Sequence, residues 1–273
     1  MRFSQKEVNL HTHTLFSHHG KGMPEDYLRE AESYGHIKVL GFSEHTPIAD
    51  SSFPQERMRM NELGPYSESV RDSKSDSILV LLGSECDWRK DFESFYREEL
   101  LGRWHFDYLL GSVHYLPDSN GDMKFVGKAT NTDLSLSEYV LLYTEMLSSG
   151  LFLYGCHPDI FMASHHDWDE DAVSASRDII SCAVENDMPL EINGNGMRKK
   201  PLVLDDGGER YLYPVAPFWE MAGDMGAKIV TASDAHKPQY VDIWNLSEEF
   251  AEPLGIKWAE YEIDPDERKI EIV

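Results

Sequence analysis

Histidine and carboxylate residues recur at the ends of the short apolar runs of this sequence. Two of the 12 histidines, His11 and His13, are two positions apart, so in an extended strand both side chains would point to one side and could hold one ion. Neutral imidazoles and carboxylates suit Zn, Mn, Fe or Ni better than Mg or Ca. The candidate ligands are His11, His13, His19, His45, Glu85, His114, His157, Asp234 and His236. These nine exceed one tetrahedral site and predict two or three ions, with Glu85 or Asp234 free to bridge.

The alternative for any one of these residues is structural. A single histidine at a strand end is more often hydrogen-bonded in the core or at the surface than a metal ligand. The agreement of six runs out of seven favours ligands for the set. We expect Cys86 and Cys156 to pack outside the sheet's ligand-bearing side, because neighbouring strand residues face opposite ways. The other histidines, which we expect to be structural or solvent-facing, are His18, His36, His105, His165 and His166.

The apolar runs alternate with segments of helical period. Runs that are apolar throughout indicate strands buried on both faces, and therefore a parallel α/β sheet. Seven such runs fit a barrel of seven or eight βα units, in which the carboxyl ends of the strands share one rim. An open doubly wound sheet is the alternative. The runs are 8–11, 37–42, 78–83, 108–113, 151–155, 190–192 and 228–231.

Four segments have the apolar spacing or the first-turn chemistry of helices. They are 24–34, 136–147, 167–186 and 215–225, and the third begins with a capping-box spacing from Asp167 to Glu170. The polar stretches 62–77 and 198–210 are expected to be long loops or loop–helix excursions. The tail, 257–273, could form a hairpin around Pro265 and Asp266.

Composition and charge exclude several classes of protein. The chain has 273 residues without a repeat or a Gly/Ser/Pro-rich linker, which predicts a single domain over 1–273. Lys and Arg number 25 against 49 Asp and Glu, and this net charge of −24 disfavours nucleic acid and anionic membrane surfaces as partners. No apolar run reaches the roughly 20 residues that span a bilayer. Three cysteines make no disulfide framework, so we expect a cytoplasmic protein.

The order of these motifs resembles a known family. It is similar to the polymerase-and-histidinol-phosphatase (PHP) superfamily of metal-dependent phosphoesterases, and most similar to its histidinol-phosphatase branch. The resemblance covers nearly the whole chain, from residue 9 to residue 236. The matching stretches are His11-Thr12-His13-Thr14, Ser17-His18-His19-Gly20, Gly41-Phe42-Ser43-Glu44-His45-Thr46-Pro47, Leu82-Gly83-Ser84-Glu85, Gly111-Ser112-Val113-His114-Tyr115, His157-Pro158-Asp159, Glu191-Ile192-Asn193, Gly196-Met197-Arg198 and Ser233-Asp234-Ala235-His236.

The resemblance implies a distorted (β/α)7 barrel of the TIM-barrel type with a trinuclear centre of Zn, Mn or Fe at the carboxyl ends of its strands. The first ion would lie among His11, His13, Glu85 and Asp234. Glu85 would bridge to a second ion that His114 and His157 complete. The third would lie among His19, His45 and His236. One departure is Glu44, which stands where relatives often have an Asp before the histidine.

The activity that the resemblance implies is hydrolysis of a small phosphorylated substrate, L-histidinol phosphate, in histidine biosynthesis, by a hydroxide that bridges the ions. Arg198 would contact the phosphate, or else be an exposed loop charge. Asp159 would protonate the leaving alkoxide or pair with the substrate's ammonium group, or else begin a helix as its N-cap. Asn193 and Tyr213 would line the pocket.

Three other functions compete with this one. A phosphoesterase acting on another small phosphate ester or a nucleotide would share the ligand set. A non-catalytic scaffold would be expected to lack ligands, and here the set is complete. A dinuclear amidohydrolase usually carries a carboxylated lysine at a strand end, and no lysine closes any of the seven runs.

Overall fold

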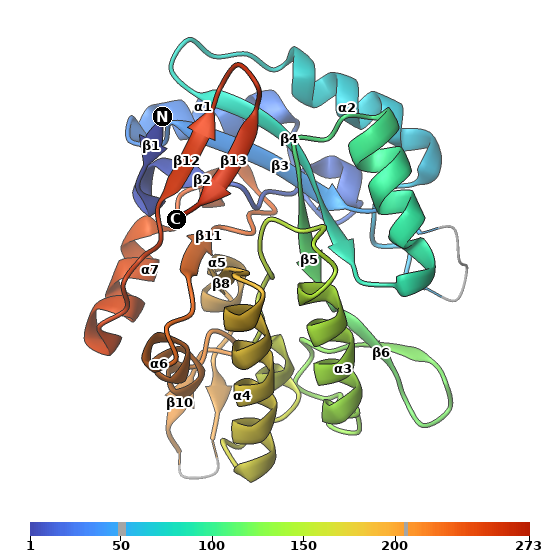
Figure 1. Cartoon of the computed structure of the whole chain (residues 1–273), viewed down its shortest axis with the longest axis vertical. Helices are drawn as coiled ribbons and strands as arrows, with labels where there is room; N and C mark the ends of the chain where they lie inside the picture. Colours follow the sequence, from blue (N-terminus) through green and yellow to red (C-terminus); the bar gives the residue numbers. More distant parts are fainter. Residues whose placement is uncertain (49–52, 205–206) are drawn as a thin grey trace.

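A parallel sheet with helices packed on its outer side forms the centre of the molecule (Figure 1). The computed structural model describes residues 1–48, 53–204 and 207–273. The strands are β1 (Arg2–Phe3), β2 (Val8–Asn9), β3 (Val39–His45), β4 (Leu79–Asp87), β5 (Tyr108–Ser112), β6 (Tyr115–Pro117), β7 (Met123–Phe125), β8 (Leu190–Asn193), β9 (Leu202–Val203), β10 (Glu209–Arg210), β11 (Ile229–Ala232), β12 (Tyr261–Asp264) and β13 (Lys269–Ile272). The helices are α1 (Pro24–Tyr34), α2 (Leu63–Asp72), α3 (Leu136–Leu147), α4 (Glu170–Glu185), α5 (Gly194–Met197), α6 (Ala216–Asp224) and α7 (Trp244–Ala251).

The sheet curls on itself. Strands β2, β3, β4 and β5 pair in this order, all parallel, and β8 pairs in parallel with β11. Single parallel bridges link the two groups: Gly155 pairs with Gly111 and with Leu190, and Thr12 pairs with Ala235. The run 151–155, predicted as a strand, contributes only this bridge residue. The parallel α/β sheet predicted from the sequence is confirmed.

The two faces of the curled sheet bury different side chains. Leu40, Phe42 and Leu82 belong to the larger apolar cluster, which includes residues of α1 to α4. Their strand neighbours Val39 and Leu81 belong to a smaller cluster on the inner face. Because side chains alternate along a strand, every second residue of β3 and β4 faces inward, and His45 and Glu85 are on this inner face.

Tyr108 fills the space beneath the strand ends. Its ring lies against Gly41 and Gly83, where a Cβ atom would come within 2.2 Å of the Tyr108 Oη and within 2.3 Å of its ring, respectively. Its hydroxyl donates a hydrogen bond to the carbonyl oxygen of Leu10 at 2.6 Å. Two neighbouring strands therefore need glycine at these positions so that one tyrosine can form a packed floor under the inner end of the sheet.

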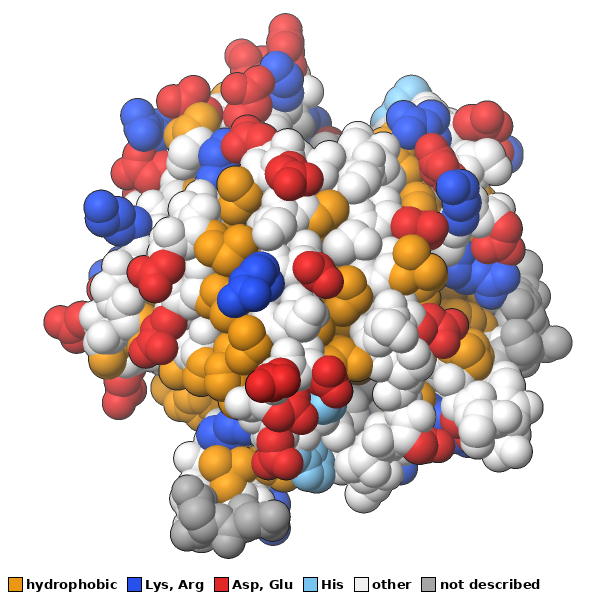
Figure 2. Space-filling view, turned by 60° about the horizontal axis from the view of Figure 1, so that its bottom comes forward, with side chains coloured by type: hydrophobic (Ala, Val, Ile, Leu, Met, Phe, Trp, Pro, Cys, Tyr) orange, Lys and Arg blue, Asp and Glu red, His pale blue; other side chains and the backbone are white. Residues whose placement is uncertain are grey.

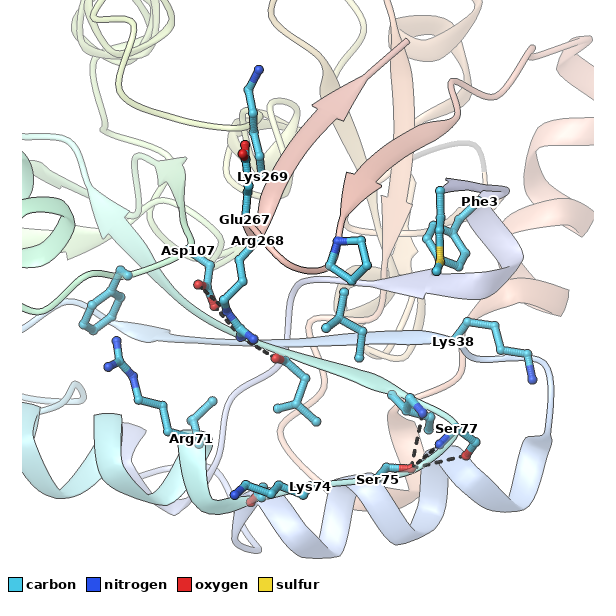
Figure 3. A pocket seen from close by; sticks show the side chains of 18 of the residues that line it. Phe3, Lys38, Arg71, Lys74, Ser75, Ser77, Asp107, Glu267, Arg268 and Lys269 are labelled. Carbon is cyan, nitrogen blue, oxygen red and sulfur yellow. Dashed lines mark hydrogen bonds and ion pairs between the residues drawn. The ribbon is translucent and has the colours of Figure 1, made fainter.

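The two ends of the chain lie together at the amino-terminal side of the strands (Figure 1). β1 pairs with β12, and β12 pairs with β13 in the hairpin that the sequence predicted. Arg268 anchors this hairpin, because its guanidinium donates to both carboxylate oxygens of Asp107 at 2.6 and 2.7 Å and to the carbonyl oxygen of Val80 (Figure 3).

A cavity of about 1230 Å³ lies beside this hairpin, away from the predicted ligands. Lys38, Lys74 and Lys269 line it, but Figure 3 shows them at separate edges of the cavity rather than converging on one point. Arg268, which also lines it, is already paired with Asp107. The volume of this cavity is therefore no sign of a binding site.

Most of the predicted helices are confirmed, with one shifted start. α1 and α3 have the predicted bounds, and the polar stretch 62–77 contains α2. The segment predicted to begin at Asp167 becomes helical only at Glu170, because Asp169 is the residue whose carboxylate accepts the Ala172 N–H at 2.9 Å. The N-cap is therefore Asp169, two residues after the Asp167 that the sequence predicted.

We expect Gly83→Ala to lower the free energy of unfolding by about 1–3 kcal/mol, because its new methyl group overlaps the Tyr108 ring and overpacks the floor. Gly223→Ala is the matched control, since nothing lies within 4 Å of a Cβ atom there, and it should be neutral or stabilising by up to about 1 kcal/mol. Urea unfolding of both variants measures the difference. Equal stability of Gly83→Ala and the parent protein would contradict the packed floor.

Candidate metal centre

The structure brings all nine predicted ligands to the carboxyl-terminal ends of the parallel strands. Seven of them are buried, His236 is half-buried and His19 is exposed. Strand ends of a curled parallel sheet open on one rim, which explains why residues so far apart in sequence meet. His11 and His13 follow β2, His19 follows the helical turn Leu15–Ser17, His45 ends β3, Glu85 lies in β4, His114 follows β5, His157 follows Gly155, and Asp234 and His236 follow β11.

Glu85 lies at the centre of five imidazoles. Its Oε2 is 2.9 Å from His45 Nδ1 and 3.4 Å from the Nε2 atoms of both His11 and His13. Its Oε1 is 2.9 Å from His157 Nε2 and 3.4 Å from His114 Nε2. The two oxygens of one carboxylate therefore face two separate sets of nitrogens, which is the arrangement that a bridging ligand requires.

A second group of ligands surrounds Asp234. Its Oδ1 is 3.3 Å from His13 Nε2 and 3.7 Å from His11 Nε2. His236 Nδ1 is 3.4 Å from the same oxygen, and the His236 Nε2 faces His19 Nε2 at 2.8 Å. The His13 ring stacks between those of His45 and His236, with centroids 4.2 and 4.5 Å away. The groups thus share ligands and form one continuous cluster.

The electrostatics of this cluster favour bound cations. Burial would raise the pKa of Glu85, but the surrounding imidazoles, His114 first, outweigh it and hold that pKa well below its usual value. Burial and the charge of His13 lower the pKa of His236 to about 3. Burial would also lower the pKa of His11, yet carboxylates, Glu191 first, raise it well above its usual value. The Glu85 and Asp234 carboxylates are therefore ionised, and a cation bound between them would be stabilised by their negative charge.

Unsatisfied atoms give a direct test of whether metal ions fit here. Among the described residues, Glu85 Oε2, Asp234 Oδ1 and His13 Nδ1 are buried without a hydrogen-bond partner. His11 Nε2 and His13 Nε2 lie 3.1 Å apart, so two ring nitrogens converge on the same space. Buried polar atoms are rarely left unpaired. Nitrogen and carboxylate oxygen donors are ligands of Zn, Mn or Fe, so the residues fit these ions.

Residues behind the ligands hold them in orientation, and sequence reasoning had given two of them no role. Asp87 accepts hydrogen bonds on Oδ1 from the His114 backbone N–H at 2.8 Å and pairs with its ring Nδ1 at 3.0 Å. Glu191 Oε1 lies 2.7 Å from His11 Nδ1. Such contacts fix the imidazole tautomer and raise ligand basicity. Asp87 could have been found, because it is two residues after Glu85 in the same strand and therefore shares its face.

Glu44 and Asn193 also help to hold the candidate ligands in orientation. Glu44, the departure from the family pattern, accepts hydrogen bonds from the backbone N–H and the hydroxyl of Thr14. Its other oxygen is 3.7 Å from His13 Nδ1. Asn193, predicted to line the pocket, donates to Glu191 at 2.9 Å and to Asp234 at 3.2 Å. Both residues contact ligands or residues that hold ligands.

A cavity of about 670 Å³ opens over the cluster. His19, His45, His114, Asp234 and His236 form its base. The other described residues that line it are Pro54, Gln55, Glu56, Arg57, Tyr115, Phe125, Lys128, Asn195, Lys199 and Tyr213. Tyr213 was predicted for the pocket and does line this cavity. The cations and the aromatic rings could receive an anionic group and an apolar body, respectively.

Arg198 is held away from this cavity. Its guanidinium donates to the carbonyl oxygens of Ser233 at 3.0 Å, Tyr240 at 2.7 Å and Asp242 at 2.9 Å. It also lies 4.9 Å from the centroid of the Tyr240 ring. Arg198 is not among the described residues that line the cavity. In this arrangement its donors bind the loop after β11 instead of a ligand.

Asp159 is also engaged elsewhere. Its Oδ2 accepts hydrogen bonds from the Val215 N–H at 2.7 Å and from the Trp219 Nε1–H at 3.0 Å, so the carboxyl group joins the start of α6 to the turn Ile160–Ala163. It is fully buried and is not among the described residues that line the cavity. Burial raises the pKa of Asp159 to about 7. This position favours a structural role over the predicted proton transfer.

The prediction for one of the two cysteines was wrong. Cys86 packs in the larger, outer cluster as expected, but Cys156 packs in the inner cluster, and its Sγ lies within 4.8 Å of ligand atoms of His11 and Glu191. The strict alternation fails here because His157 has φ of +34°, outside the extended region. Cys156 therefore sits beneath the ligands on their own side of the sheet.

The fold and the site define a class: an α/β protein with a buried, histidine-rich cluster at the strand ends that could hold metal ions. Comparison with protein families gives a match to the "PHP domain" over residues 9–195. Two similar relatives are both named "Probable histidinol-phosphatase". The protein of Deinococcus radiodurans is 30% identical over 84% of this chain and 85% of its own length, and that of Schizosaccharomyces pombe is 22% identical over 91% and 87%. The chain belongs to the PHP family.

A solved structure has the same fold. Histidinol phosphate phosphatase of Lactococcus lactis, crystallised with Zn, L-histidinol and phosphate, matches 97% of this chain and 99% of its own, with a TM-score of 0.65 and 18% identity. No helix among the described residues is long and apolar enough to cross a membrane.

We expect Glu85→Gln to reduce bound metal to at most about one ion per chain, because the amide loses the charge and one of the two bridging oxygens. Elemental analysis after dialysis against Zn measures it, and the parent protein should carry about two or three ions. Glu99→Gln, which changes a surface carboxylate paired with Arg103, is the matched control and should keep the parent stoichiometry. Full metal content in Glu85→Gln would contradict the bridging role.

We expect Asp159→Asn to gain stability relative to the parent as pH rises. The folded pKa of Asp159, about 7, exceeds that of an unfolded aspartate, so ionisation costs the parent stability progressively between about pH 4 and 7, by at most about 4 kcal/mol. The asparagine keeps the acceptor oxygen and does not titrate. Unfolding at pH 5 and 7 measures this difference.

The same variant tests the role of Asp159 in turnover. If Asp159 is structural, kcat of Asp159→Asn changes only a few-fold, whereas loss of a general acid lowers kcat by about 10²-fold or more.

Proposed function

We propose that this protein hydrolyses a phosphate monoester with divalent transition-metal ions, and that the substrate is L-histidinol phosphate. The observation that carries the proposal is Glu85, whose two oxygens face two sets of imidazole nitrogens beneath an open cavity. The names of the two relatives and the ligands crystallised with the Lactococcus lactis protein support the choice of substrate. The products would be L-histidinol and phosphate.

The metal ions would be held as the sequence resemblance implies. Glu85 would bridge one ion among His11, His13 and Asp234 to another at His114 and His157, with a third at His19, His45 and His236. Bound divalent ions lower the pKa of water toward about 7 and neutralise phosphoryl oxygens. The protein's own residues would set the geometry, because Asp87 and Glu191 orient imidazoles.

The cavity contains groups that suit the alcohol part of this substrate. Histidinol carries an ammonium group and an imidazole ring. Glu56 is exposed at the cavity wall, and it could pair with the ammonium group in the place proposed for Asp159. The rings of Tyr115 and Phe125, whose centroids are 5.7 Å apart, could pack against the imidazole of histidinol. Tyr213 adds a third aromatic ring to the cavity lining.

We also propose that the sheet closes into a barrel, that the chain is one domain and that the protein is cytoplasmic. The single bridges at Gly155 and between Thr12 and Ala235 support a closed, distorted (β/α)7 barrel. Pairing of β1 with β12 supports one domain over 1–273. The cytoplasmic location stays a prediction. The net charge of −24 supports a small phosphorylated substrate over nucleic acid. Figure 2 shows acidic side chains on one face of the molecule, with lysines and arginines singly or in small groups among them.

The test is phosphate release from a panel of phosphate monoesters, with histidinol phosphate, a nucleoside monophosphate and a sugar phosphate at equal concentration. We expect histidinol phosphate to have the highest kcat/KM, by about 10-fold or more, since only it offers both an ammonium group and an imidazole. Chelation should abolish turnover, and added Zn or Mn should restore it. Full turnover by metal-free protein, or a preference for another ester, would contradict the proposal.

A further inference from the structure

Three cationic side chains line the cavity above the ligands, and one of them differs from the others. Lys128 is exposed and Lys199 is half-buried, with its Nζ 6.0 Å from the centroid of the Phe125 ring. Arg57 also lines the cavity, yet only 3% of it is exposed. A buried arginine at the edge of a polar cavity must be held by specific partners, because an unpaired buried charge is costly.

Arg57 is fixed on three sides. Its Nε donates to the carbonyl oxygen of Pro54 at 3.0 Å, its Nη1 to that of Thr46 at 3.1 Å and its Nη2 to Asp87 Oδ2 at 2.8 Å. The guanidinium carbon lies 4.7 Å from the centroid of the Phe53 ring. These bonds use three of the five N–H groups of the guanidinium, and leave one hydrogen on each Nη atom without a partner among the described residues.

Asp87 connects this arginine to the metal centre. The carboxylate that receives Arg57 on Oδ2 receives His114 on Oδ1, through both the backbone N–H and the ring Nδ1. The other ring nitrogen of His114 faces Glu85 Oε1 at 3.4 Å. The buried Asp87 carboxylate therefore fixes the Arg57 guanidinium in the cavity wall relative to the His114 imidazole in the cavity base.

We propose that Arg57, oriented by Asp87, binds the phosphoryl group of the substrate, in place of the Arg198 suggested by the sequence. This inference rests on the proposed function and names a further substrate contact for it. The planar guanidinium with one free N–H on each Nη can donate to phosphoryl oxygens. Arg198 gives its donors to three backbone carbonyls instead. Asp87 is a positioning residue, since it acts through Arg57 and His114.

The experiment measures binding of inorganic phosphate to Zn-loaded protein by calorimetry, together with metal content, kcat and KM. Arg57→Lys keeps the charge and loses the planar fork, so we expect the Kd of phosphate to rise about tenfold or more at unchanged metal content. Arg57→Met should lose still more. Arg59→Lys, an exposed arginine two residues along the chain, is the matched control and should keep the parent Kd. The loss in Arg57→Lys should exceed the loss in Arg198→Lys.

Asp87→Asn tests whether Asp87 positions both Arg57 and His114. Because Asp87 also orients His114, this variant should lose both phosphate affinity and part of its bound metal, whereas Arg57→Lys loses phosphate affinity alone. A Kd within twofold of the parent in Arg57→Lys, or a greater loss in Arg198→Lys, would overturn the inference and leave the proposed hydrolysis intact. Failure of the Zn-loaded parent to bind phosphate or release it from any ester would contradict both.

Discussion

The site depends on one buried carboxylate surrounded by imidazoles. Glu85 is 1% exposed and has five histidine nitrogens within 3.4 Å, from strands on both sides of it and from across the sheet. A buried negative charge is tolerated only where positive charge and hydrogen bonds compensate for it. The imidazoles that meet at the strand ends supply this compensation, above a packed floor. Tyr108, which requires glycine at positions 41 and 83, supplies that floor.

The backbone is strained where it delivers ligands. His157 and Asp234 have φ of +34° and +45°, in the left-handed region that residues with a Cβ atom avoid. Each such residue costs roughly 1–2 kcal/mol, and no glycine relieves it because the side chains themselves are needed. Both side chains face the cluster, so at these two positions the left-handed backbone directs a candidate ligand. Positive φ also occurs away from the candidate ligands, at His18, His105, Asp187 and Arg268.

The sequence predicts which candidate ligands meet, but it gives no role to Asp87 or Glu191, which contact two of them. The meeting of the nine candidate ligands could be predicted because the strand ends of a parallel sheet share a rim, and because six of the seven apolar runs end in such residues. Asp87 and Arg57 belong to none of the predicted motifs, and only the fold brings Arg57 to Asp87 and Asp87 to His114. Arg198 and Asp159 stood beside the right motifs, but only tertiary contacts decide where a side chain donates or accepts. Cys156 was misplaced because a left-handed residue cannot be predicted from alternation alone.

The central claim is that several metal ions lie around Glu85 at the mouth of the curled sheet. Diffraction data from crystals grown with Zn, collected on both sides of the Zn absorption edge, test it most directly. The account predicts two or three anomalous peaks inside the cluster, with a Glu85 oxygen within about 2.0–2.2 Å of each of two ions. A single peak away from Glu85, or none at the strand ends, would contradict it.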